Sequence, residues 1–324
     1  MQRVLIVFFV SFIFSTTMLI AHYDDEYEYR EPIKEVTIDK KALEKIVANG
    51  HNSDFTFKAE SRKDIVISGF KTFASRKSVS KEDQTAIFAT LSLKAESSGS
   101  TLEITTDEDR DEAEDLGIKL NNYGFSLKVL VPEKMNIEAE THNGSIHTKG
   151  GIFSTIDNTT HNGSQTYTAK RFETFEVESH NGSIIIKNTI IADAQVTTHN
   201  GEIKLEKTKC TKAKIEGHNG NIILKDTEGI ITAEDHNGHF EAQNVLFIGN
   251  SKVTSHNGDI DIDFDSRSEL KIIASSEHGF PFQNQDITES FKIDKKGESF
   301  FIELGRPKYE LALQTDNGEI RLKK

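Results

Sequence analysis

The chain lacks the residues on which disulfide-stapled and cysteine-rich zinc folds depend. It has one cysteine, Cys210, among 324 residues, so it can neither close an intramolecular disulfide nor supply a zinc site rich in cysteine. It has no tryptophan and four prolines, and 35% of its residues are hydrophobic. This composition argues against a multi-pass membrane protein and a proline-rich linker protein. A chain of this length can bury a sizeable core, so we expect packing and hydrogen bonds to stabilise it.

The chain also has fewer positively charged than negatively charged residues. The 39 Lys and Arg residues are outnumbered by 52 Asp and Glu residues, which gives a formal net charge of -13. A surface of this sign repels both a phosphate backbone and an anionic bilayer. We therefore expect no nucleic-acid partner.

The sequence also lacks familiar catalytic motifs. It contains no Gly-x-Ser-x-Gly, no phosphate-binding loop and no His-Glu-x-x-His pattern. Cys210 falls where neighbouring repeats place Ile191 or Phe172, so we expect a buried apolar filler and not a nucleophile. Four carboxylates alternate with apolar residues and predict an exposed polar face, with calcium or sugar binding as the alternative: Asp259, Asp261, Asp263 and Asp265. The sequence thus predicts no catalytic residues and no bound cofactor, apart from a divalent metal considered below.

The amino-terminal segment predicts export. An apolar run from residue 4 to 14 follows one positive charge, and a second short run ends at Ala21. Residues 1–21 therefore predict a signal peptide. Because a large residue lies three positions before the expected cut, an uncleaved membrane anchor formed by residues 4–21 stays open as the alternative. Residues 22–32 form an acidic linker, and either hypothesis places the rest of the chain in the periplasm, at the cell surface or among secreted proteins.

The tripeptide His-Asn-Gly recurs at steps of 18 to 20 residues and dominates the second half of the chain. Such a repeat indicates a stacked architecture. Its histidines are His142, His161, His180, His199, His218, His236 and His256. The pairs that follow them are Asn143 and Gly144, Asn162 and Gly163, Asn181 and Gly182, Asn200 and Gly201, Asn219 and Gly220, Asn237 and Gly238, and Asn257 and Gly258. Weaker motifs continue the spacing through His278-Gly279, Lys296-Gly297 and Asp316-Asn317-Gly318.

Each repeat offers two short strands. Apolar residues alternate from Gly182 to Ile186 and again from Ala192 to Thr198, as in strands with one buried face. A repeat of about 19 residues cannot bury that face alone, whereas stacked repeats complete parallel ladders and a shared core. We therefore predict an all-β fold, a parallel β-solenoid (β-helix) of about 19-residue coils. Its regular part covers residues 141–324, and residues 33–140 form an irregular β region of early coils and a cap.

The Asn-Gly pairs predict a sharp turn in every coil, because asparagine tolerates a positive φ and glycine adopts it without steric cost. In a stacked array the asparagine side chains also lie one above another, where each amide can bond to the next. The residue before each histidine is in phase with the inward column and is usually Ser or Thr, so small hydroxyls line the corner. The polar segments 81–84 and 107–115 predict solvated loops, with calcium sites as the alternative.

The order of the elements resembles a known family. A strand at residues 126–132, which ends at a proline, leads through residues 136–140 into Thr141-His142-Asn143-Gly144 and the array. This resembles the bacterial putative-adhesin family of β-solenoid domains, whose members combine an export signal with Thr/Ser-x-Asn-Gly-x-Ile coils. The resemblance covers residues 33–324 and implies the solenoid fold. Because the shared residues are turn and core positions, it implies a surface-binding role only through the family's label.

The histidine before each Asn-Gly departs from that family pattern and needs its own explanation. The seven histidines recur in phase, so we expect one file with rings about 4.8 Å apart. The simplest hypothesis is that they flank turns and stack on one another. A second is a metal site, since imidazole suits zinc, copper and nickel and neighbouring coils could share an ion. A third is a pH response, because protonating closely spaced imidazoles creates like-charge repulsion.

We predict an exported, non-enzymatic, adhesin-like β-solenoid that presents a regular face to an envelope or surface ligand, either a protein or a glycan. Two other functions stay open. One is a metal- or pH-responsive envelope protein that uses the histidine file. The other is a polysaccharide-processing solenoid enzyme, which needs clustered carboxylates in a groove.

Overall fold

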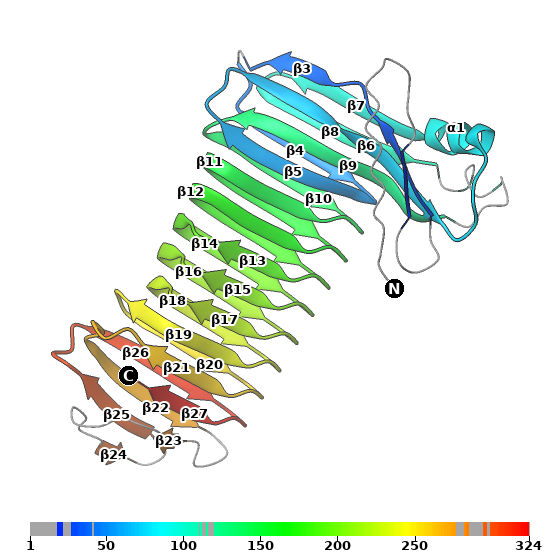
Figure 1. The fold of residues 1–324 in the computed structure, drawn as a ribbon. Coiled ribbons are helices and arrows are strands. Elements are labelled where there is room, and N and C mark those ends of the chain that lie inside the picture. The colour runs from blue at the N-terminus through cyan, green and yellow to red at the C-terminus, as the bar shows by residue number, and fades with distance from the viewer. Residues whose placement is uncertain are drawn as a thin grey trace, which may run out of the picture.

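The chain folds into a rod of stacked β-coils with a broader cap at its amino-terminal end (Figure 1). The computed structural model describes residues 18–21, 27–40, 42–109, 111, 115, 120–276, 282–284, 294–296 and 299–323. The predicted all-β parallel solenoid is confirmed. Most of the predicted export segment, residues 1–17, lies outside the described residues. Within the part that is described, no helix has both the length and the apolar character to cross a membrane.

Each regular coil consists of a first strand, a tight corner and a second strand. In one coil, β13 (Ile184–Lys187) leads to β14 (Ile190–Thr198). Both strands pair in parallel with their counterparts in the next coil. The later first strands are β15 (Ile203–Glu206), β17 (Ile222–Lys225), β19 (Phe240–Phe247) and β21 (Ile260–Phe264). The later second strands are β16 (Lys209–Gly217), β18 (Glu228–Asp235) and β20 (Ser251–Ser255). In each of the two preceding coils the first and second strands are continuous and form a single long strand, β11 (Ile146–Thr160) or β12 (Gln165–Ser179).

Alternate residues of both strands fill the interior of the rod. In β13 and β14 the side chains of Ile184, Ile186, Ile191 and Val196 are fully buried. Burial of each such side chain stabilises the fold by roughly 1.5–3 kcal/mol relative to exposure. Cys210 stands in register with Ile191, and its burial raises the pKa of its thiol to about 12. Cys210 is therefore a buried filler, as the sequence predicts.

At the amino-terminal end the coils stack out of sequence order. The first coil, β4 (Lys45–Gly50) and β5 (Ser53–Glu60), lies between two coils that follow it in the chain. On its outer side it pairs in parallel with β8 (Thr101–Glu108) and β9 (Asn121–Pro132). On its inner side it pairs in parallel with β10 (Met135–Thr141) and β11. The first coil is thus held on both faces before the regular array begins.

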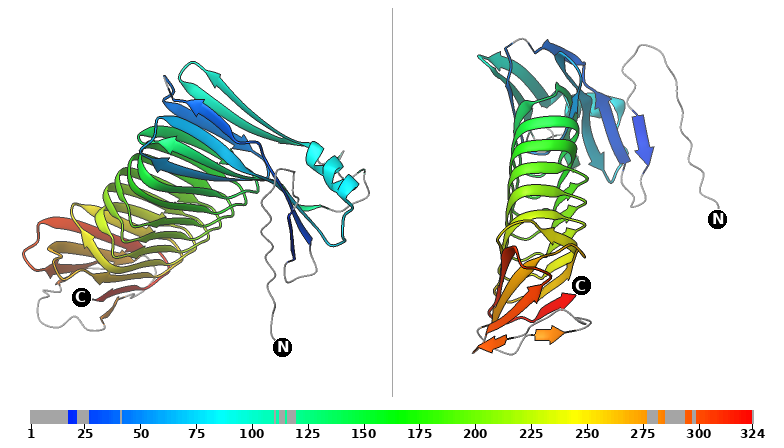
Figure 2. Two further views of the ribbon diagram at one scale, coloured as in Figure 1. Left: turned by 45° about the horizontal axis from the view of Figure 1, so that its top comes forward. Right: turned by 90° about the vertical axis from the view of Figure 1, so that its left-hand side faces the viewer.

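Antiparallel strands cover the outer edge of this end. β6 (Asp64–Ser75) pairs with β9, and β7 (Leu91–Ser98) pairs with β8. Outside them, β2 (Tyr27–Pro32) and β3 (Val36–Asp39) pair with β6, and β1 (Met18–Ala21) pairs with β2. These strands form the broad end seen in Figure 2. Covering the last parallel strands matters because an open sheet edge is a template for aggregation.

The cap also contains helix α1 (Lys81–Ala89), where the sequence predicted a solvated loop at residues 81–84. The helix begins at Ser80, whose side-chain oxygen accepts a hydrogen bond from the N–H of Asp83 at 3.1 Å. Its Ile87 and Phe88 are buried in the cap. The loop prediction was wrong because a capping serine and two apolar residues outweigh the polar composition of the first turn.

The carboxyl-terminal end repeats the out-of-order arrangement. The last coil, β26 (Tyr309–Thr315) and β27 (Ile320–Lys323), lies between β20/β21 on one side and β22 (Leu270–Ser276) with β23 (Phe282–Asn284) on the other. β25 (Ser299–Leu304) pairs antiparallel with β22, and β24 (Asp294–Lys296) pairs antiparallel with β25. Residues 278, 279 and 297 of the weaker motifs lie outside the described residues. The final motif therefore stacks directly on the coil of Asn257, and the motifs do not follow one another in simple succession.

Candidate functional site

Glycine is required at the His-Asn-Gly corner because adjacent coils approach each other closely there. A Cβ atom built on Gly163 would lie 1.7 Å from the carbonyl oxygen of Gly144, and one built on Gly201 would lie 2.1 Å from that of Gly182. Real Cβ atoms essentially never come within 3.0 Å of another heavy atom. The other glycines of the column that meet a glycine carbonyl in the same way are Gly182, Gly220, Gly238, Gly258 and Gly318.

The predicted positive φ at the Asn-Gly pairs was wrong. Left-handed residues lie instead where the first strand of a coil passes into the second, at Lys134, Asn188, Lys207 and Asp226, with φ values of 64°, 53°, 50° and 49°. Asn244, with a φ of 53°, takes the same place within β19. The corner glycines are absent from the left-handed set. The neighbouring coil's carbonyl oxygen, and not the backbone conformation, therefore excludes a side chain at the His-Asn-Gly corner.

Small polar side chains close this corner from inside, as the sequence predicts. The side-chain oxygen of buried Ser179 accepts a hydrogen bond from the N–H of Gly182 at 2.9 Å. Asp235 occupies the same column, and its Oδ1 accepts from the N–H of Gly238 at 2.7 Å while its Oδ2 has no partner. Burial raises the pKa of Asp235, although its backbone hydrogen bonds act in the opposite direction. Among the described coils, Asp235 is thus the one carboxylate in this inward column. It leaves one buried oxygen without a hydrogen bond, whereas serine or threonine would bring only one side-chain oxygen to this position.

The corner asparagines form a continuous ladder. Each side-chain Nδ2 donates to Oδ1 of the asparagine in the adjacent coil, at 2.7–2.8 Å throughout. The ladder joins Asn52, Asn143, Asn162, Asn181, Asn200, Asn219, Asn237, Asn257 and Asn317. All the amides point the same way, so their dipoles align. At the donor end, the carboxylate of Glu108 accepts from both the backbone N–H and Nδ2 of Asn52, which places a negative charge where the aligned dipoles favour it.

The corner histidines form the predicted file. Ring centroids of neighbours in adjacent coils lie 4.6–4.8 Å apart, while the angles between ring planes vary from 2° to 85°. The file runs through His51, His142, His161, His180, His199, His218, His236 and His256. The spacing is set by the strands, whereas the ring orientation is free to differ from coil to coil.

The sequence analysis did not predict the two end members of the file, His51 and Asp316. His51 joins it because the coil of β4 and β5 is inserted beneath β10 and β11, and its ring stacks on that of His142 at 4.7 Å and 4°. The signal was the Asn-Gly-His-Asn order around this residue. At the other end Asp316 takes the place of histidine, and its Oδ2 lies 2.7 Å from Nδ1 of His256. The file therefore ends in a carboxylate.

Near this carboxylate the file brings together a set of metal-ligating groups. Ligand atoms of Glu234, His236 and His256 all lie within 4.8 Å of one another. Oε1 of Glu234 is 3.5 Å from Nε2 of His256. The hydrogen bond to Asp316 raises the pKa of His256, and Glu234 acts in the same direction. The two carboxylates thus lie on opposite sides of one imidazole ring.

A second set has the same composition in the middle of the rod. Ligand atoms of Glu178, His180 and His199 also lie within 4.8 Å of one another, and Oε1 of Glu178 is 3.7 Å from Nε2 of His180. Nδ1 of His180 is buried without a hydrogen-bond partner. In both sets the glutamate lies two residues before a histidine. Glu140 and Glu216 also lie two residues before a histidine, but the described residues form no such set there, so the sequence pattern alone does not identify these sets.

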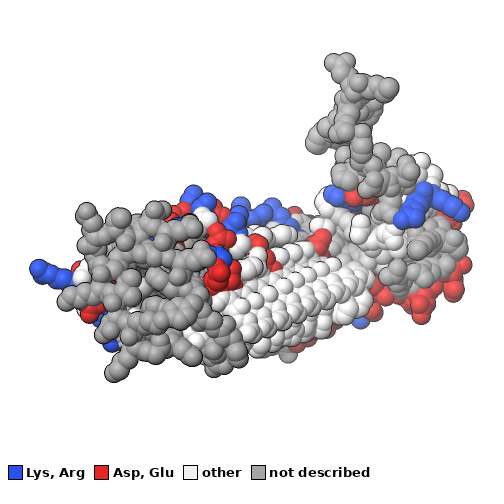
Figure 3. All heavy atoms as spheres, turned by 90° about the horizontal axis from the view of Figure 1, so that it is seen from below, with Lys and Arg blue, Asp and Glu red and all other residues white. Residues whose placement is uncertain are grey.

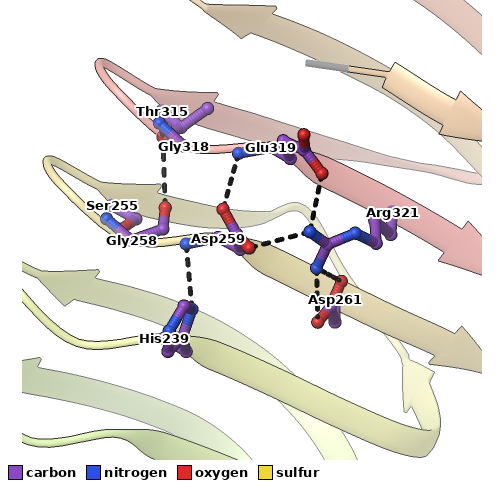
Figure 4. Close-up of polar contacts among 9 residues, drawn as sticks. All are labelled: His239, Ser255, Gly258, Asp259, Asp261, Thr315, Gly318, Glu319 and Arg321. Atoms are coloured by element: carbon purple, nitrogen blue, oxygen red, sulfur yellow. Dashed lines mark hydrogen bonds and ion pairs between the residues drawn. The ribbon is translucent and has the colours of Figure 1, made fainter.

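Two of the four alternating aspartates, Asp259 just before β21 and Asp261 within it, take part in a network that joins the last coil to its neighbour (Figure 4). The guanidinium of Arg321 in β27 reaches Asp259 at 2.9 Å, Asp261 at 3.1 Å and Glu319 at 2.6 Å. Farther along, Arg267 donates to Asp265, and this hydrogen bond lowers the pKa of Asp265 to about 2. Three of the four carboxylates, Asp259, Asp261 and Asp265, are therefore paired with arginine.

The corner columns meet a hollow at the amino-terminal cap. Its volume is about 740 Å³, and Asn52 and Asn143 of the ladder line it together with residues of β2, β6 and β9. Charged groups on its wall include Asp54 and the pair formed by Glu28 and Arg30, which lie 3.4 Å apart. The hollow extends the asparagine ladder into a polar recess.

Comparison with known proteins gives a family and a set of similar folds. The sequence profile of the family described as Toastrack DUF4097 matches residues 43–323. A "putative lipid binding protein" from Parabacteroides distasonis has a similar structure, with a TM-score of 0.50 and 14% identity over 91% of this chain and 97% of that one. A "putative adhesin" from Bacteroides fragilis aligns with a TM-score of 0.43 and 14% identity, over 89% of this chain and 97% of the other. No curated protein matches the chain. Identities this low extend to the fold alone.

Proposed function

Because the chain belongs to the Toastrack DUF4097 family, we propose that it is an exported, non-enzymatic rod that binds an envelope or surface ligand along its His-Asn-Gly corner. The observation that supports this is the corner itself, where imidazole rings and amides repeat at the strand spacing over the length of the rod. From Asn143 to Asn317 the asparagines of the corner are exposed, and Asn52 is half-buried. A rod of this kind presents many identical groups to one ligand at once.

The corner suits a ligand that is itself repetitive and polar but weakly charged. Apart from Asp316 at the end of the histidine file, its His, Asn and Gly columns contain no acidic or Lys/Arg side chain. Figure 3 shows a strip of regular rows along the rod without coloured charged residues. Hydrogen bonds within the ladder hold the amides in place, so little conformational entropy is lost on binding. Many weak contacts then act together, which raises the overall affinity without any single strong site. A neutral polysaccharide has these properties.

The remaining surface gives less support to the polysaccharide-processing alternative. Glycoside hydrolysis uses two carboxyl groups that flank the scissile bond, about 5–9.5 Å apart in a groove. Two of the alternating carboxylates, Asp259 and Asp261, are already bound by Arg321, which neutralises them beside a hollow of about 250 Å³. This favours binding over turnover as the role of the rod.

The test is retention of the full chain on immobilised neutral polysaccharides, compared with a variant carrying His161→Gln and His199→Gln. The control variant carries Lys207→Gln at the opposite corner. We expect the histidine variant to lose retention and the control to keep it. Equal retention of both variants would contradict a role for the corner, and release of shortened sugar chains would contradict the non-enzymatic proposal.

A further inference from the structure

We infer that Glu234, His236 and His256 form a zinc-binding site at the carboxyl-terminal end of the histidine file, held in place by Asp316. This site lies on the same corner as the proposed polysaccharide binding but depends on different contacts. It is distinguished from the rest of the file by the contacts of both imidazole rings.

The ligand set has the composition that zinc prefers. Two imidazoles and one carboxylate with an open fourth position are the protein ligands of many zinc sites. Zinc bonds of about 2.0–2.1 Å in tetrahedral geometry place neighbouring ligand atoms roughly 3.3 Å apart. The 3.5 Å between Oε1 of Glu234 and Nε2 of His256 is close to that separation. One imidazole nitrogen and one carboxylate oxygen are therefore already spaced for a shared ion.

The second nitrogen of each ring has an acceptor of its own. Nδ1 of His256 lies 2.7 Å from Oδ2 of Asp316, and Nδ1 of His236 lies 3.5 Å from the carbonyl oxygen of Gly217. An N–H at Nδ1 leaves the lone pair at Nε2, which is the tautomer that binds a metal. Histidine ligands in metal sites characteristically donate their other N–H to a carboxylate or a backbone carbonyl. Both acceptors are present here.

The similar set in the middle of the rod lacks this support. Nδ1 of His180 is buried and has no hydrogen-bond partner, so nothing fixes its tautomer. The Glu178, His180 and His199 set therefore has the same ligand types as the zinc site without its acceptors. It is a control that the chain itself provides.

Zinc binding requires a small rearrangement of the file. The rings of His236 and His256 stand 4.8 Å apart with 29° between their planes, whereas a bound metal lies in the plane of each imidazole that holds it. Both rings must turn toward a common point beside Glu234. The side chain of His256 is 38% exposed and that of Glu234 is 49% exposed, so these turns need no change in the core.

The experiment is a calorimetric titration of the full, metal-free chain with zinc chloride near neutral pH. We expect one saturable site per chain, lost in Glu234→Gln and in His256→Gln and unchanged in the matched control His180→Gln. Asp316→Asn should weaken zinc binding by about 10-fold or more, because it acts through His256. The melting temperature of each metal-free variant shows whether it is folded, so a loss of binding at an unchanged melting temperature assigns the effect to the site.

Three results would overturn the inference. One is the absence of a saturable site in the wild-type chain. Another is an equal loss of zinc binding in His180→Gln and His256→Gln, which would mean that the file chelates without a specific site. The third is an Asp316→Asn variant with unchanged affinity, which would remove the positioning role. None of these results bears on retention by polysaccharides, which is measured without zinc.

Discussion

At the scale of the residue, each corner position is determined by what the adjacent coil places against it. At the glycine position, a carbonyl oxygen of the adjacent coil leaves no room for a side chain. Each asparagine is held by hydrogen bonds to the amides of its two neighbours. The inward residue must supply a side-chain oxygen that accepts a hydrogen bond from the glycine N–H. The repeat could be identified from the sequence, and so could the ladder. The reason for the glycine could not, because the carbonyl belongs to another repeat and its approach depends on how the coils stack.

The close approach of adjacent coils predicts a large effect of Gly201→Ala. Its Cβ would lie 2.1 Å from the carbonyl oxygen of Gly182, and that backbone atom cannot move without disturbing both coils. We expect a loss of about 3 kcal/mol in the free energy of unfolding, measured by urea denaturation. Gly217→Ala is the control, since its Cβ would meet a side-chain oxygen of Asp235 at 3.0 Å and no backbone atom nearer than the carbonyl oxygen of Gly220 at 3.4 Å. Equal losses in the two variants would contradict the close-approach argument.

The burial of Asp235 predicts that Asp235→Thr increases the stability of the fold, by an amount that depends on pH. Threonine occupies the same column at Thr141 and Thr198, where its hydroxyl accepts from the glycine N–H. The substitution removes the unpartnered Oδ2, so we expect about 1–2 kcal/mol more stability near pH 7.

The sign of this pH dependence follows from the direction of the shift. Burial raises the pKa of Asp235 above its ordinary value of 3.8, so ionisation costs the folded state more than the unfolded state. The carboxyl group is tolerated below pH 3.8 and becomes destabilising as the pH rises above it. The advantage of threonine should therefore shrink on acidification, when both proteins are compared by denaturation across pH. An advantage that grows at low pH would contradict the assignment.

At the scale of the element, the terminal coils differ from the central ones in what holds them. Central coils are held by strands that are neighbours in sequence, but β27 reaches β21 across a long excursion and is joined to it by Arg321. The individual strands could be predicted from alternating residues such as Ile260 and Ile262. Their neighbours could not, because a pairing across sixty residues depends on three-dimensional packing that no local pattern records.

The arginine network predicts that Arg321→Gln makes the last coil, β26 and β27, open more often than in the wild-type protein. The substitution removes charge-assisted contacts to Asp259, Asp261 and Glu319 and leaves three carboxylates close together. We expect faster amide hydrogen exchange in β26 and β27, with exchange in β14 unchanged. Arg267→Gln, which breaks a pair within one loop, should leave exchange in β27 as it is. Unchanged exchange in β27 of the Arg321 variant would show that strand pairing alone holds the last coil.

At the scale of the whole molecule, the inserted terminal coils make the corner columns continuous from the cap to the last coil. The histidine repeat from residue 142 to 256 could be found in the sequence, whereas His51 and Asp316 join the file only because their coils are inserted between others. The same insertion lets antiparallel strands cover both outer edges of the parallel stack. Among the described residues, the rod therefore has antiparallel strands at both ends and continuous corner columns between them.

The most direct test of this continuous corner is a disulfide cross-link between its first two members. Adjacent parallel strands lie about 4.8 Å apart, within the Cα separations of about 4.4–6.8 Å that a disulfide spans. A chain carrying His51→Cys and His142→Cys should therefore form an intramolecular disulfide under mild oxidation, detected by mass spectrometry, although the positions are 91 residues apart. A chain carrying His51→Cys and His161→Cys, two coils apart, should remain unlinked. No link in the first pair, or an equal yield in the second, would contradict the stacking order on which the continuous corner depends.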